Sequence, residues 1–305
     1  MVDSPTSMLA DGIRYLRGGS LDRARACFEQ ATSSRDPRIR SEALRRLADI
    51  KRRRAEWEDG LMLTRRARSV ARRAGLREEE AAALNIEATI HLQKGDFEPA
   101  VALYRAGLEL KPGARQRGLI CQNLGTAYAQ HGRLAEASEW YARSAAAFRV
   151  AGQRREAMLA LINQGNLQMD RGELAEAEKI FRDGLAYMNE DPSPDTELHG
   201  LIEMNLAEAL GRQGSELDHA LDLVLSATGT FAASENRPYL VACHRVLALI
   251  SERRGEWETA ISALEHGRDL AAEIGSGPEV VRLEQELSRL QREREQSPAQ
   301  STEAP

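Results

Sequence analysis

The chain has 305 residues, of which 42% are hydrophobic and 29% are charged, and its formal net charge is −5 at pH 7. This composition is typical of a folded soluble protein, and the mild negative charge argues against nucleic acid as a partner. No stretch reaches the roughly 18 continuous apolar residues that a membrane-spanning helix requires, and residues 1–11 lack the segments of a signal peptide. We therefore expect a cytoplasmic protein that does not bind membranes. Abundant arginine and alanine fit a GC-rich bacterial genome.

A short pattern recurs seven times along the chain. It consists of a bulky apolar residue, a small residue three positions later, an apolar residue four further on, and another small residue three beyond that. The copies start 36, 40, 37, 40, 43 and 40 residues apart, at Leu21, Trp57, Phe97, Leu134, Leu174, Leu217 and Trp257. Thr64 alone breaks the apolar rule. A period in this range is the signature of a stacked repeat array, whose surface typically holds another molecule.

A second apolar pattern with helical spacing precedes each copy, and a turn residue separates the two patterns. Glycine at such a turn tolerates the left-handed backbone that ends a helix and reverses the chain. Each unit is therefore predicted to be a helix, a tight turn and a second helix. The turn residues are Gly19, Ala55, Gly95, Gly132, Gly172, Gly214 and Gly255.

The expected organisation is an N-terminal tail over residues 1–4 and a repeat array over residues 5–277. Residues 278–295 are predicted to form a helix that caps the last unit, through an apolar stripe that includes Leu283 and Leu287. The heptad-like spacing of the stripe leaves self-association through this helix open as an alternative. Residues 296–305 are expected to be disordered. The units are placed at about 5–37, 41–75, 78–113, 115–151, 154–191, 196–233 and 238–275.

The fourth unit resembles the tetratricopeptide repeat (TPR) signature through Asn123, Leu124, Gly125, Tyr128, Gly132, Ala137 and Tyr141. The fifth unit is similar, with Asn163, Gln164, Gly165, Gly172, Ala177 and Phe181. Spacings near 40 residues resemble the long-helix variety of this family. The resemblance implies an all-α, right-handed α-solenoid superhelix of seven TPR helix-turn-helix units plus a C-terminal capping helix.

In proteins of this family, the first helix of each unit lines a concave groove. The corresponding positions of this sequence predict a partner-binding surface that changes character along the chain. The second unit contributes Arg45, Asp49, Arg52 and Arg53. The third and fourth units contribute Asn85, Thr89, Gln93, Gln122, Thr126 and Gln130. The fifth and sixth units contribute Ile162, Asn166, Met169, Met204 and Glu208.

The predicted surface suits an extended protein or peptide segment. Amide side chains can bond its main chain, and methionines can seat an apolar anchor. Residues 38–77 hold fourteen Arg or Lys against five acids, so an acidic portion of the partner is one option. The alternatives are that the amides bridge repeats and that the arginines form a solvated face. The family's carboxylate clamp is not reproduced, because its Lys and Asn positions hold Arg45 and Asp49.

The sequence shows no arrangement typical of catalysis. The six histidines never pair at metal-ligand spacing, and no GxSxG or phosphate-binding glycine loop is present. Cys27, Cys121 and Cys243 are widely separated and fit small core positions in a reducing compartment. We expect no cofactor and no enzymatic activity. The predicted function is a protein-interaction scaffold or adaptor. The alternative is a peptide-responsive regulator of the TPR sensor type that acts on a separate effector.

Overall fold

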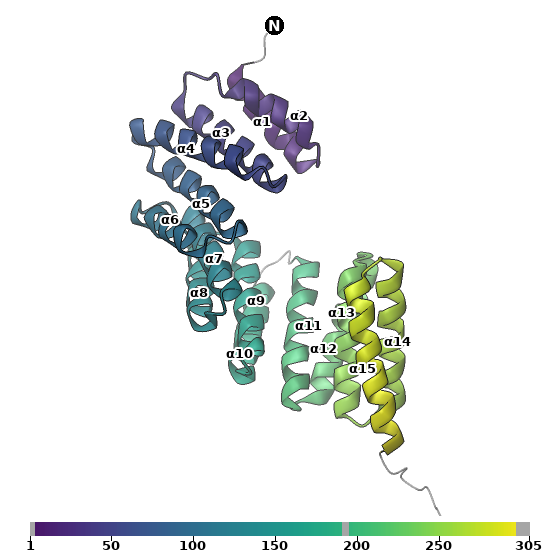
Figure 1. Ribbon diagram of the computed structural model, residues 1–305. Coiled ribbons are helices and arrows are strands. Elements are labelled where there is room, and N and C mark those ends of the chain that lie inside the picture. Colours follow the sequence, from purple (N-terminus) through teal and green to yellow (C-terminus); the bar gives the residue numbers. More distant parts are fainter. Residues whose placement is uncertain (1–3, 191–194, 297–305) are drawn as a thin grey trace, which may run out of the picture. The chain divides into compact units, whose positions relative to one another are not determined.

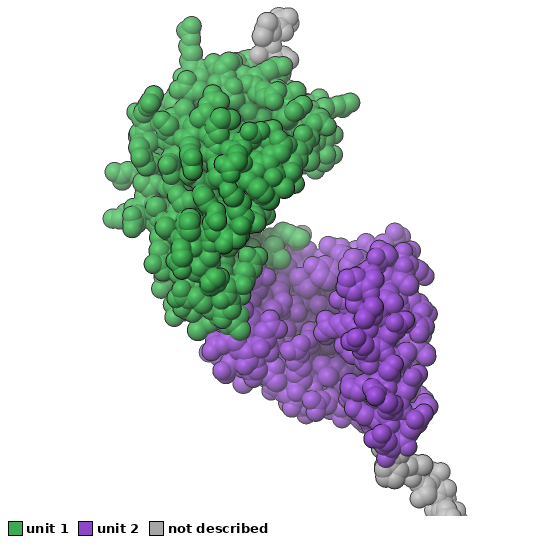
Figure 2. Space-filling model, viewed as in Figure 1, with its two compact units in different colours: residues 1–160 green, residues 161–305 purple. Residues whose placement is uncertain are grey.

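The computed structural model describes residues 4–190 and 195–296, which form fifteen α-helices and no strand (Figure 1). The chain divides into two compact units, residues 1–160 (unit 1) and residues 161–305 (unit 2) (Figure 2). Unit 1 contains α1 (Pro5–Arg17), α2 (Leu21–Ala31), α3 (Pro37–Arg53), α4 (Trp57–Arg73), α5 (Arg77–Gln93), α6 (Phe97–Glu109), α7 (Ala114–Gln130) and α8 (Leu134–Val150).

The unit boundary falls within α9 (Arg154–Asp170). Unit 2 continues with α10 (Leu174–Asn189), α11 (Thr196–Gln213), α12 (Leu217–Ala233), α13 (Arg237–Arg253), α14 (Trp257–Glu273) and α15 (Gly277–Gln296). The helices therefore form seven pairs followed by a single helix. This arrangement confirms the predicted all-α repeat fold.

Every predicted turn residue has a positive φ, between 57° and 88°, which is the left-handed region that favours glycine. Ala55 adopts this conformation with φ 57°, at the energetic cost of its Cβ. The turn between α11 and α12 spans three residues like the other turns within pairs, but its glycine stands three positions before the bulky Leu217 and not two, and both Gly214 and Glu216 are left-handed. These turns reverse the chain so that the two helices of each pair lie against each other.

The two helices of a pair interlock through a small residue on the first and a large residue on the second. At Gly125, an added Cβ would lie 2.7 Å from the Tyr141 ring, so the ring rests directly on the backbone of α7. Gly12 and Phe28 make the same contact. Where the second helix carries the smaller Leu264, the first helix has alanine, Ala248, and both are buried. The repeated pattern of small and bulky residues is thus a set of close helix contacts.

Within unit 1, adjacent first helices pack on one another more extensively than adjacent second helices do in the described part of the chain. Contacts join α1 to α3, α3 to α5, and α5 to α7. The side chains that α3, α5 and α7 direct away from their second helices therefore form one surface, the first-helix face. The second helices are spread apart on the opposite, outer side.

Pro37 begins α3, whereas the sequence placed it at the end of the first unit. The proline fits this position because the first helical residue needs no N–H donor, and Asp36 caps the helix by accepting from the N–H of Arg38 at 2.8 Å. Residues 191–194, at the junction of the fifth and sixth predicted units, and most of both predicted tails lie outside the described residues.

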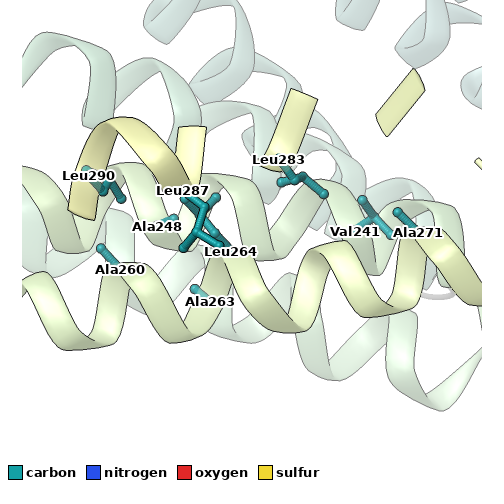
Figure 3. Packing of buried hydrophobic residues seen from close by; sticks show 9 residues of the cluster. All are labelled: Val241, Ala248, Ala260, Ala263, Leu264, Ala271, Leu283, Leu287 and Leu290. Atoms are coloured by element: carbon teal, nitrogen blue, oxygen red, sulfur yellow. The ribbon is translucent and has the colours of Figure 1, made fainter. Parts of the chain in front are cut away.

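The final helix, α15, covers the last helix pair. Leu283, Leu287 and Leu290 are buried against α13 and α14, in a cluster that includes Val241 and Leu264 (Figure 3). The apolar stripe proposed as a capping or self-association seam is therefore occupied within unit 2. Among the large apolar residues of α15, Val281 is exposed.

Gly125→Ala tests the close contact inside a helix pair. Its new methyl group would overlap the Tyr141 ring, so we expect a loss of about 1–3 kcal/mol in the free energy of unfolding. The control is Gly229→Ala in α12, where no atom lies within 4 Å of the added Cβ. That change should stabilise the protein by about 0.5–1 kcal/mol. Thermal unfolding followed by circular dichroism measures both, and equal effects would contradict the interlock.

Leu287→Ala tests the capping role of α15. Removing this buried side chain should cost about 2–5 kcal/mol and speed amide hydrogen exchange throughout α15. Val281→Ala, at a side chain that is 53% exposed, should change stability by less than about 0.5 kcal/mol. Unchanged exchange in α15 of the Leu287→Ala variant would show that the helix does not depend on this contact.

Candidate functional site

The sequence-predicted residues divide between the two units. Ten lie on the first helices α3, α5 and α7 of unit 1, and five lie on α9 and α11 in unit 2. On α3, Asp49 accepts hydrogen bonds from Nε of Arg52 at 2.9 Å and from Nε of Arg53 at 3.0 Å. Arg52 also donates to Oε1 of Gln93 on α5 at 3.2 Å. Two of the arginines predicted to bind a partner, Arg52 and Arg53, therefore already donate hydrogen bonds to Asp49.

Arg45 of α3 is largely buried. Its side chain is 20% exposed, its nearest carboxylate is Glu42 at 3.7 Å, and its Nε is buried without a partner among the described residues. Burial lowers the pKa of the Arg45 guanidinium, the charge of Arg46 acts in the same direction, and Glu42 opposes both. A ligand oxygen placed here would satisfy a donor that the fold leaves unbonded.

Three predicted polar residues are bonded inside the repeats. Asn85 accepts a hydrogen bond from the amide of Asn123 on α7 at 3.0 Å. The Thr89 hydroxyl bonds the main chain of its own helix at 2.8 Å and the hydroxyl of Tyr104 at 3.0 Å. Thr126 repeats this arrangement with Tyr141 at 3.2 Å. Both threonine hydroxyls are therefore engaged inside the repeats, by the main chain of their own helix and by a tyrosine of the second helix.

The two predicted glutamines of α7, Gln122 and Gln130, remain available. Gln130 is exposed and Gln122 is partly exposed, and neither side chain has a hydrogen-bond partner in residues 4–190 and 195–296. Both project from the helix whose Asn123 is bonded to α5. Their amides offer donors and acceptors beside the bonded row of Arg52, Gln93 and Asn85.

The apolar part of the predicted surface is largely enclosed. Ile162, Met169 and Met204 are 5%, 6% and 5% exposed, so they are core side chains and not the accessible patch expected from the sequence. Hydrophobic residues on a first helix fill space between helices before they can serve a ligand. Asn166, partly exposed, has its Oδ1 buried without a partner in the described part of the chain.

Glu208 is also buried, and it belongs to an ion network on unit 2. It accepts from Nη2 of Arg212 at 2.6 Å and from Nη1 of Arg245 on α13 at 3.5 Å. The sequence predicted Glu208 as a partner-binding residue. The structure holds its carboxylate between two arginines, as a buried charge requires.

This network borders a cavity of about 280 Å³ that sequence reasoning missed. Its walls come from α11, α13, α14 and α15, and two hydrogen bonds of 2.7 Å join Arg289 of α15 to Glu252 of α13. The hydrogen bonds to Glu252 raise the pKa of Arg289 above its usual range. The sequence did indicate part of this cavity. In the seventh unit, the first-helix positions that were considered in earlier units are occupied by Arg245, Leu249 and Glu252.

Two further properties concern the described residues as a whole. They contain no cluster of three or more His, Cys, Asp or Glu side chains arranged to hold a metal ion. None of the helices α1–α15 combines the length and the apolar character needed to cross a membrane.

Comparison with protein families matches residues 79–276 to the model described as the MalT-like TPR region. A second model, described as tetratricopeptide repeat, matches residues 40–112. Comparison with proteins of curated function gives no match.

Several solved structures are similar in fold. The signal transduction ATPase with numerous domains (STAND) protein with a tetratricopeptide repeat sensor from Pyrococcus horikoshii is 16% identical, with a TM-score of 0.63 over 99% of this chain and 47% of that chain. The apo form of RapI is 15% identical, with a TM-score of 0.59 over 88% and 75%. BtubC from P. vanneervenii is 16% identical, with a TM-score of 0.58 over 76% and 93%. At these identities the likeness concerns the fold alone.

The burial of Tyr104 predicts that the stability of the fold depends on pH. Burial raises the pKa of Tyr104 to about 12, and the hydrogen bond from Thr89 partly opposes this rise. The unfolded tyrosine titrates near about pH 10, so the folded state holds the proton more tightly. This contribution to stability is complete below about pH 10 and is lost as pH rises through about 12. Tyr104→Phe should flatten the loss of stability in this window, as measured by urea unfolding. An identical pH profile in the variant would contradict the assignment.

Proposed function

The chain belongs to the family of MalT-like TPR regions, and from this membership we propose that unit 1 binds an extended segment of a partner protein on its first-helix face. A TPR array is a protein-interaction surface built from repeated helix pairs, and its binding chemistry lies in side chains that packing does not consume. The site residues named from the sequence are part of this proposal where the structure leaves them accessible.

The observation that carries the proposal is the pair of unbonded amides on α7. Gln122 and Gln130 adjoin a row in which Arg52 bonds Gln93 and Asn85 bonds Asn123. These bonds between helices hold the row in place before a ligand arrives, which lowers the entropy lost on binding. An extended segment would receive main-chain hydrogen bonds from the two glutamines.

Charge on α3 favours an acidic portion in that segment. The face and its border carry Arg45, Arg46, Arg52 and Arg53 against Glu42 and Asp49, which leaves a sum of +2. The unbonded Nε of Arg45 would gain a partner from a carboxylate of the ligand. We propose that the acidic portion lies over α3 and the main-chain contacts lie over α7.

We propose a binding role without catalysis, in the cytoplasm. The charged side chains predicted on α3 form ion pairs within that helix, Glu42 with Arg45 and Asp49 with Arg52 and Arg53, which is a usual arrangement for structural charges. Cys121 and Cys243 are buried thiols, and burial raises the pKa of each to about 11, which suits unreactive core residues in a reducing compartment.

A second candidate function rests on the cavity of unit 2. Its paired charges, Glu208 with Arg245 and Glu252 with Arg289, could exchange partners with a small charged ligand. Such an exchange would act on α15, which caps the unit. The Pyrococcus horikoshii STAND protein of similar fold has a tetratricopeptide repeat sensor, which supports a ligand-responsive regulator as the alternative.

The double variant Gln122→Ala/Gln130→Ala tests the main proposal. A partner would first be identified by affinity purification with mass spectrometry and its binding segment mapped. Loss of two hydrogen bonds at about 0.5–1.5 kcal/mol each should weaken calorimetric binding of that segment by about 5-fold to 150-fold.

The matched control is Gln30→Ala, an exposed glutamine on the second helix α2, which should leave affinity unchanged. Equal affinity of the double variant and the original protein would refute the first-helix face as the binding surface. A partner that binds both variants equally but loses affinity with Arg289→Ala would favour the cavity of unit 2.

A further inference from the structure

The outer side of unit 1 carries a hollow between the second helices α6 and α8. Its volume is about 430 Å³, within the range of pockets that hold small ligands or side chains. Its floor is the first half of α7. The side chains that matter here are Leu108, Arg117, Cys121, Trp140, Arg143 and Val150, and two alanines of α8 complete the lining.

The size of the hollow follows from a small residue on α7. Cys121 lies sixteen residues before Ala137, and the same position of the second, third and fifth units holds Leu44, Leu84 and Leu161. The outer hollow of unit 1 that Leu44 lines, between α2 and α4, has a volume of about 270 Å³. A cysteine in place of leucine leaves more of the floor open.

The length of the second helices also contributes. Helix α6 has 13 residues, whereas α8 has 17, so the last turn of α8 continues past the end of α6. Val150 in this turn is 75% exposed, the highest value among the exposed large apolar residues of the described chain. The hollow is therefore apolar at its floor and along one wall, and open to solvent.

The charged residues that line the hollow are Arg117 and Arg143, and both are positive. Arg117 is exposed and has no ion pair or side-chain hydrogen bond among the described residues. Arg143 lies over the ring of Trp140 at 4.6 Å, and its contact with Glu139 is long, at 3.8 Å. By contrast, the hollow between α2 and α4 includes Glu29 and Asp59 in its lining.

The positive charges of Arg117 and Arg143 both affect the pKa of the Cys121 thiol. Burial raises its pKa to about 11, while the charges of Arg143 and Arg117 act in the opposite direction. Both guanidinium groups are thus close enough to act on the floor of the hollow. The thiol itself stays protonated and behaves as a small apolar surface.

We propose that the hollow between α6 and α8 docks a segment of a partner protein in which an apolar side chain is flanked by carboxylates. The apolar side chain would cover Cys121 and Leu108, and the carboxylates would pair with Arg117 and Arg143. This occupant fits because the lining combines an apolar floor with two arginines and contains no acid. The docking site lies on the side of unit 1 opposite to the first-helix face.

The test uses capped peptides with the cores Glu-Leu-Glu, Gln-Leu-Gln and Glu-Ser-Glu, added to the intact chain. Indole N–H resonances of the three tryptophans report binding, and Trp140→Phe assigns the resonance of Trp140. We expect the Glu-Leu-Glu peptide to shift this resonance, with an affinity that falls as salt is raised. The other two peptides should bind at least about tenfold more weakly, since each lacks one half of the recognition.

Cys121→Leu fills the floor and should weaken binding of the Glu-Leu-Glu peptide by about tenfold or more, with an unchanged or higher midpoint of thermal unfolding. Arg117→Gln/Arg143→Gln should weaken binding similarly and remove its salt dependence. Arg73→Gln, an exposed arginine at the end of α4, is the matched control and should bind normally.

A Glu-Leu-Glu peptide that leaves the Trp140 resonance unmoved would overturn the proposal, as would equal binding by the Cys121→Leu variant. Equal binding of the Gln-Leu-Gln peptide would also overturn it, by showing an apolar surface without charge selection. These variants leave Gln122 and Gln130 intact, so failure here is distinct from failure of the first-helix face.

Discussion

The packing of a small residue on the first helix against a larger residue on the second helix sets the distance between the two helices of a pair. At Gly125 the ring of Tyr141 rests on the helix backbone, with no room for a Cβ. Such a contact brings two helix axes close together and fixes how each pair presents its outer surfaces. The equivalent contact recurs between Gly12 and Phe28 and between Gly165 and Phe181. Helix pairs built on the same contact are similar enough to stack on one another. The left-handed turns, positive in φ at all seven positions, make this pairing possible.

Stacking then decides which polar side chains remain free. First helices of unit 1 lie against each other, so their side chains meet those of the next repeat. Arg52 reaches Gln93, Asn123 reaches Asn85, and tyrosines of the second helices take the hydroxyls of Thr89 and Thr126. Side chains with a partner hold repeats in register, whereas Gln122, Gln130 and the Nε of Arg45 keep unused capacity. In unit 2, the carboxylate of Glu208 is enclosed by arginines for the same reason.

On the outer side of unit 1, the same packing leaves hollows between adjacent second helices, and side chains of different size fill these hollows to different degrees. Second helices stand apart, and the residue of the following first helix that lies beneath them sets the depth of each space. Leucine at position 44 and cysteine at position 121 give hollows of about 270 Å³ and 430 Å³. A change of one core residue thus alters the volume of a surface hollow, because a repeat array is only two helices thick and its core lies directly beneath both faces.

The sequence by itself determined the helix pairs, their turns and the capping stripe of α15. These features depend on local backbone preference and on the spacing of small and bulky residues, which repeat along the chain. Only the tertiary structure decided which predicted binding residues are accessible. Ile162, Met169 and Met204 are enclosed, and Thr89 and Thr126 are bonded to tyrosines fifteen residues away. The cavity bordered by Glu252 and Arg289 joins residues of different helices, and no local pattern encodes such a meeting. Burial and hydrogen-bond partnership are properties of neighbours in space, so they appear only once the repeats are stacked.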